Sequence, residues 1–190
     1  IENNIKDLTF NEIPNDDLET CKYKTNQIFQ NKEFNFYIHS ILETKNAELI
    51  HSFAHDFVEE YFLQIDYEKC VFYYNKAIEF GYKDAYLSLV DLAYKNFCIE
   101  NRTILFDDKP INSIRMLNFI LEAKEPNLVI QRLIKEKEID LLVNIPDLLF
   151  DHWSACFYDY DEYIQDGLTY YFLNLSYENG SDVGKLQLLS

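Results

Sequence analysis

The chain has 190 residues, a formal net charge of −16 and an apolar content of 48%. This length fits one domain or one elongated array, and the apolar content argues against intrinsic disorder despite the charge. Such an excess of carboxylates repels nucleic acid and anionic membranes, and it attracts basic protein surfaces. With only 4 Gly and 4 Pro, the chain has few tight turns, which favours helices over a sandwich or barrel.

The N-terminal third predicts three helices in succession. The segment up to Pro14 is polar, and Asp16 or Asp17 is expected to cap a first helix that ends near residue 30. A second helix is expected over 34–44 and a stronger third helix over 47–63. Apolar residues of the third helix recur at steps of three and four, which places them on one face. They are Leu49, Ile50, Phe53, Ala54, Phe57, Val58 and Tyr61.

Residues 66–94 form the clearest unit and predict an antiparallel helical hairpin. Asp66 is expected to cap the first helix. Gly81 is expected to end it, because glycine tolerates the left-handed conformation found after a helix end. Asp84 is expected to cap the second helix. The expected apolar positions are Cys70, Tyr73, Tyr74, Ala77 and Ile78, then Ala85, Leu87, Leu89, Val90, Leu92 and Ala93.

This hairpin resembles a Sel-one-like repeat of the tetratricopeptide superfamily. The match is carried by Tyr73, Tyr74, Ala77, Gly81, Ala85 and Leu89. The chain departs from the family at four positions. The family has Ala where this chain has Cys70 and Ile78. It has Gly at the position of Val90 and Tyr at the position of Ala93. The resemblance implies a superhelical stack of helical hairpins that binds other proteins.

A stack needs neighbours, because one hairpin cannot bury its own face. We expect the helix at 47–63 to end a degenerate preceding repeat. A helix at 111–123 would begin the following repeat after a loop at 100–110. Further helices are expected over 127–136, 146–157 and 162–177, with residues 139–144 ahead of a break at Pro146.

The predicted fold class is therefore all-α. We expect a single domain over 1–190, built as a short α-solenoid. Its repeat-like antiparallel hairpins cover about 47–123 and form a right-handed superhelical stack. Acidic helices follow over 138–184.

Residues 138–184 carry ten Asp or Glu and no Lys or Arg, which is −10 of the total charge of −16. The run 157–163 alternates aromatic residues with carboxylates. The simpler interpretation is a solvated start of a helix, where the helix dipole stabilises carboxylates near the N-terminus. The alternative is a binding surface for a basic protein, because tyrosine and carboxylates together suit arginine. Its candidate residues are Asp151, Tyr158, Asp159, Tyr160, Asp161, Glu162, Tyr163 and Asp166, with Tyr73 of the hairpin as a separate candidate.

No motif predicts catalysis, a metal or a cofactor. His51 and His55 are four residues apart, but Ser52 stands where the zincin pattern needs Glu. His152 and Cys156 are also four apart, but their acidic surroundings disfavour a thiolate. Asp159, Asp161, Glu162 and Asp166 lack the glycine and the final glutamate of a calcium-binding loop.

Three functions are compatible with the sequence. The first is an acidic immunity or inhibitor protein that covers the active site of a basic toxin such as a nuclease. The second is a general Sel-one-like adaptor that binds proteins around Tyr73. The third is an enzyme at His152 and Cys156. We favour a non-enzymatic protein without cofactors in the cytoplasm, since the four cysteines form neither a zinc pattern nor a dense disulfide framework and no stretch could span a membrane.

Overall fold

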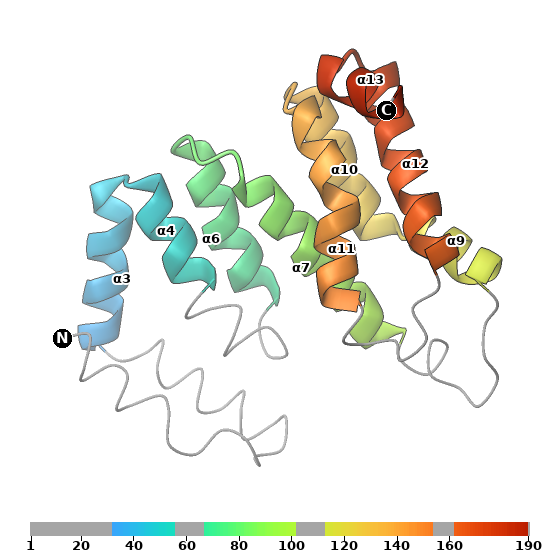
Figure 1. The fold of residues 1–190 in the computed structure, drawn as a ribbon. Coiled ribbons are helices and arrows are strands. Elements are labelled where there is room, and N and C mark those ends of the chain that lie inside the picture. Colours follow the sequence, from blue (N-terminus) through green and yellow to red (C-terminus); the bar gives the residue numbers. More distant parts are fainter. Residues whose placement is uncertain (1–31, 56–66, 102–112, 154–161, 190) are drawn as a thin grey trace. The chain divides into compact units, whose positions relative to one another are not determined.

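The computed structural model describes residues 32–55, 67–101, 113–153 and 162–189 (Figure 1). Within these ranges, all regular secondary structure is helical, with nine α-helices and one 3₁₀-helix. The all-α prediction is confirmed. The chain divides into two compact units, residues 1–82 (unit 1) and 83–190 (unit 2). The single domain and the superhelical stack remain predictions.

The described part of unit 1 contains α3 (Lys32–Thr44), α4 (Ala47–Phe53) and α6 (Tyr67–Glu79). Helix α4 packs against both of the others. Asn46 starts α4, because its side-chain oxygen accepts a hydrogen bond of 3.1 Å from the backbone N–H of Leu49. The helix predicted over 47–63 is seen as α4, and its residues after 55 lie outside the described ranges. The buried apolar residues of unit 1 are Ile38, Ile41, Ile50, Phe53, Ala54, Cys70, Tyr73, Tyr74, Ala77 and Ile78.

Helix α6 ends as its sequence predicts. Gly81 has a φ of +107°. Its N–H donates to the carbonyl of Ile78 at 3.0 Å, and the N–H of Tyr82 donates to the carbonyl of Ala77 at 2.9 Å. These two bonds define a Schellman motif, which satisfies carbonyls left over at the helix end. All five apolar positions expected on α6 are buried. The packing of α6 against the next helix crosses the boundary between the units, so the hairpin itself remains a prediction.

Unit 2 begins with α7 (Ala85–Glu100), which packs against α10 (Lys124–Lys135) and α11 (Ile145–Trp153). Helix α7 starts directly after Asp84, as expected. Pro146 lies in the first turn of α11, also as expected, because the missing N–H of proline costs no helical bond there. Residues 139–144 form the 3₁₀-helix η3 (Ile139–Asn144). The buried side chains of α7, α10, η3 and α11 are Ala85, Tyr86, Leu89, Val90, Asp91, Leu92, Ala93, Tyr94, Pro126, Ile130, Leu133, Leu142, Ile145, Pro146 and Leu149.

Helix α12 (Glu162–Glu178) is the longest described helix and packs against α9 (Ser113–Leu121), α11, η3 and α13 (Asp182–Leu188). It also ends in a Schellman motif, in which Gly180 has a φ of +97° and the N–H groups of Gly180 and Ser181 donate to the carbonyls of Tyr177 and Ser176. Helix α13 was not predicted from the sequence. Ser181 begins it, because its Oγ accepts a 3.1 Å bond from the N–H of Gly184 and donates a 2.5 Å bond to Oδ1 of Asp140. The Asp140 contact ties α13 to η3.

Candidate partner-binding surface

Most residues predicted for the acidic surface lie at the limits of the described structure. Tyr158, Asp159, Tyr160 and Asp161 lie outside the described residues. Asp151 lies in α11, and Glu162 and Tyr163 begin α12; only their backbone positions are described. Asp166 is exposed on α12, as a binding residue must be. Sequence reasoning therefore identified the helix, and the structure identifies which of its residues face solvent.

Tyr73, the separate candidate, is only 6% exposed. Its ring meets Phe53 and Phe72 edge-on, with centroid distances of 5.1 and 5.2 Å. Burial raises the pKa of Tyr73 to about 12. These contacts make Tyr73 a packing residue of unit 1. A direct contact between its ring and a partner would require unit 1 to rearrange, which counts against this prediction.

The outward face of α12 carries tyrosines and carboxylates. Tyr170 is 68% exposed and Tyr177 is 49% exposed. They share the exposed side of the helix with Asp166, Tyr171 and Glu178, and α12 contains no Lys or Arg. Residues Ile164, Leu168, Phe172 and Ser176, spaced by four, are buried on the opposite side. We call Asp166, Tyr170, Tyr171, Tyr177 and Glu178 the α12 surface.

Sequence reasoning missed three tyrosines and one glutamate of the α12 surface. The helix expected over 162–177 does not by itself divide inward-facing from outward-facing residues. The spacing of four residues between Ile164, Leu168, Phe172 and Ser176 marks the buried side of the helix. The tyrosines then fall on the other, exposed side. The missed residues are Tyr170, Tyr171, Tyr177 and Glu178.

The carboxylates of unit 2 differ in how they are compensated. Glu138 forms a 3.1 Å ion pair with Lys83, and Asp140 accepts the bond from Ser181. Within the acidic segment 138–184, four others are exposed and form no ion pair in the described parts of the chain: Asp147, Asp166, Glu178 and Asp182. Uncompensated charge of one sign lowers the stability of the compact state unless a counter-charge arrives.

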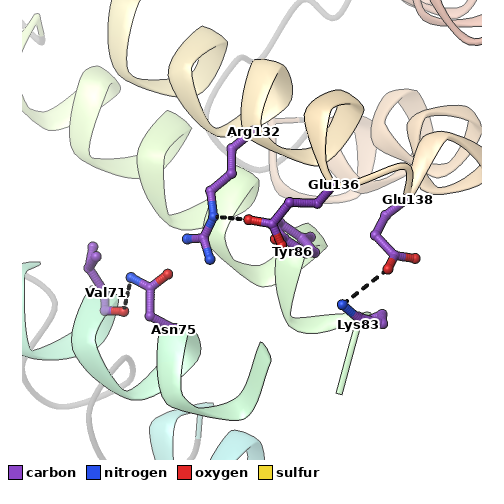
Figure 2. A network of polar contacts seen from close by, with 7 residues as sticks. All are labelled: Val71, Asn75, Lys83, Tyr86, Arg132, Glu136 and Glu138. Atoms are coloured by element: carbon purple, nitrogen blue, oxygen red, sulfur yellow. Dashed lines mark hydrogen bonds and ion pairs between the residues drawn. The ribbon is translucent and has the colours of Figure 1, made fainter. Parts of the chain in front are cut away.

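One polar network in unit 2 shows how this chain holds an arginine (Figure 2). The guanidinium of Arg132 lies over the ring of Tyr86, 5.3 Å from its centroid. Nε of Arg132 donates a 2.8 Å hydrogen bond to Glu136, and the hydroxyl of Tyr86 donates to the same carboxylate. The bonds from Tyr86 and Arg132 hold the pKa of Glu136 below its usual value. Burial, followed by the bond to Glu136, raises the pKa of Tyr86 to about 12.

The histidine pair of α4 takes part in an aromatic cluster. The ring centroid of His51 lies 4.6 Å from that of Tyr82, 5.5 Å from that of Tyr74 and 6.5 Å from that of His55. Among the described residues, no three His, Cys, Asp or Glu side chains lie close enough together to hold a metal ion. Cys156, the predicted partner of His152, lies outside the described residues.

Comparison with protein families, curated proteins and solved structures found no match to this chain. Of the helices in the described ranges, none has both the length and the hydropathy that a membrane crossing requires.

Proposed function

We propose that this chain is a non-enzymatic protein that binds a basic protein partner. More specifically, we propose that the chain is an immunity or inhibitor protein. It would neutralise a basic toxin, such as a nuclease, by covering the toxin's active site. The observation that supports the proposal is the α12 surface, where exposed tyrosines stand beside carboxylates that have no counter-charge in the described part of the chain.

Both side-chain types suit a protein interface. Tyrosine contributes a large contact area with few rotatable bonds, and it is enriched among residues that dominate binding energy. Carboxylates accept paired hydrogen bonds from arginine, and a surface of one sign speeds the encounter with an oppositely charged partner. The toxin's active site is the favoured target because a nuclease needs a basic surface to bind its own anionic substrate.

We assign the protein to a reducing compartment, the cytoplasm. Cys70 is buried in the core of unit 1, where we propose that it packs as a small apolar residue.

The proposal is tested by affinity capture from the source organism. We would compare the wild type, an Asp166→Lys/Glu178→Lys variant and a Glu48→Lys/Glu79→Lys control, whose exposed carboxylates belong to unit 1. The proposal predicts one basic protein that the wild type and the control retain and the first variant loses. An acidic captured protein, or equal retention by all three, would contradict it.

A general adaptor is the second candidate function. It is favoured by α6, where the residues that resemble a Sel-one-like repeat are buried and Gly81 ends the helix as a repeat requires. The exposed neighbour of Tyr73 on this helix is Phe72. In the same capture experiment, loss of the partner by Phe72→Ala, with no effect of Asp166→Lys/Glu178→Lys, would favour the adaptor.

A further inference from the structure

The chain binds one of its own arginines between a ring and a carboxylate. At the network of α7 and α10, a tyrosine ring lies under the guanidinium of Arg132, and a carboxylate accepts its Nε–H (Figure 2). The ring faces the cation while the carboxylate fixes its orientation. In unit 1, Nζ of Lys76 lies 5.9 Å from the ring centroid of Phe72 and 2.7 Å from Glu79, so a ring and a carboxylate can also hold a lysine. The combination suits arginine better, because a planar guanidinium can lie flat on a ring, whereas an ammonium is a compact, strongly hydrated charge.

The α12 surface repeats the same two groups without a cation. Asp166 and Tyr170 are one helical turn apart, so their Cβ atoms are neighbours at about 5–6 Å. Helical side chains lean toward the N-terminus, which directs the ring of Tyr170 toward the turn that carries Asp166. Both residues are exposed, and neither side chain has a hydrogen bond, ion pair or ring contact in the described part of the chain.

We infer that Asp166 and Tyr170 form a receptor for an arginine side chain of the basic partner. The inference rests on the proposed function and makes it specific. The guanidinium stacks on the ring of Tyr170 and donates to the carboxylate of Asp166, as Arg132 does with Tyr86 and Glu136. Tyr177 does not form an equivalent pair, because Leu173 precedes it by one turn.

Charge decides between the possible occupants of this pair. A second copy of the chain is disfavoured, because each copy carries a net charge of −16. Nucleic acid and anionic lipid are repelled by the same field. A partner lysine would supply the positive charge but would lose the stacking contribution.

The test compares fluorescently labelled deca-arginine and deca-lysine, which carry equal charge, by anisotropy titration against the full chain. Wild type is expected to bind deca-arginine about fivefold more tightly. Asp166→Asn and Tyr170→Ala are expected to abolish this preference, whereas Tyr170→Phe keeps the ring and therefore the preference. Glu48→Gln, a charge control in unit 1, is expected to keep it as well. Tyr177→Ala is also expected to keep the preference for deca-arginine, even if it changes the affinity for both peptides.

The outcomes separate the inference from the function on which it rests. Equal binding of both peptides by wild type would overturn the arginine receptor and leave the basic partner standing. A preference that survives in Tyr170→Ala or Asp166→Asn would overturn it too. If neither peptide binds, the attraction of this surface for basic polypeptides fails, and both proposals fail together.

Discussion

Gly184 of α13 lies against Ser176 of α12, with no room for a side chain on the glycine. A Cβ atom at Gly184 would lie 2.8 Å from Oγ and 2.9 Å from Cβ of Ser176. It would also lie 3.0 Å from the backbone nitrogen of Tyr177, which cannot move without the helix. The contact fixes α13 at the C-terminal end of the α12 surface.

We therefore predict that Gly184→Ala destabilises unit 2 by about 1–3 kcal/mol, the usual cost of overpacking. Alanine favours a helix by about 1 kcal/mol over glycine, so the sign of the result separates packing from propensity. Urea unfolding followed by far-UV circular dichroism measures the change. Lys185→Ala, at an exposed neighbouring position, is the control and should change stability by less than about 0.5 kcal/mol. A stabilised Gly184→Ala would refute the close approach.

Lys137 adopts a backbone conformation that favours glycine. Its φ is 65°, and it follows α10 in the position that Gly81 occupies after α6. The same two bonds are present, from Lys137 N–H to Ile134 and from Glu138 N–H to Leu133, both at 3.1 Å. Lys137→Gly should therefore stabilise unit 2 by about 1 kcal/mol, because the left-handed region costs an ordinary residue about that much.

Gly81→Ala provides the reciprocal measurement. A Cβ atom there would meet nothing within 4 Å, so only the backbone conformation is tested. We expect a loss of about 1 kcal/mol in unit 1. Thermal unfolding of Lys137→Gly and Gly81→Ala measures both effects. Changes in unfolding temperature of the same sign would be incompatible with the assigned helix ends.

High pH should destabilise both units. The pKa values of Tyr73 and Tyr86 are raised from 10.0 to about 12 in the folded protein. The folded chain therefore keeps these protons at a pH where the unfolded chain loses them. The free energy of unfolding should be insensitive to these groups below about pH 10 and fall as the pH rises toward about 12.

Tyr86→Phe isolates the contribution of unit 2. It should cost about 1 kcal/mol at neutral pH through the lost hydrogen bond to Glu136, and it should reduce the alkaline decline. Tyr170→Phe, at an exposed ring, should change neither the stability at neutral pH nor the decline in stability at alkaline pH. Urea titrations at several pH values, read by the fluorescence of Trp153 in unit 2, measure both effects. An alkaline decline as steep in Tyr86→Phe as in wild type would contradict the assignment.

Sequence patterns predicted those parts of the fold whose causes are local. The apolar steps of α6, the glycine that ends it and the proline in the first turn of α11 act within a few residues. Helix α13 was missed because its pattern is inverted. Its apolar residues Val183 and Leu186 are exposed, while its buried position is Gly184.

Tyr86 shows why longer-range features escaped prediction. It was not among the expected apolar positions of α7, yet it is fully buried, and its hydroxyl bonds to a carboxylate fifty residues away in the chain. Only the packing of α7 on α10 makes a buried tyrosine acceptable there. The α12 surface differs from Tyr86, because the spacing of four between its buried residues lies within the helix itself.

The most direct test of the account is the association rate constant between this chain and its captured partner, measured by stopped flow at low and physiological salt. For wild type, electrostatic steering predicts a rate that falls about tenfold or more as salt is raised from about 0.01 M to 0.15 M. Asp166→Lys/Glu178→Lys should associate slowly at both concentrations, whereas Glu48→Lys/Glu79→Lys should follow the wild type. An association rate that neither salt nor the α12 substitutions change would contradict the claim that this acidic surface recruits a basic protein.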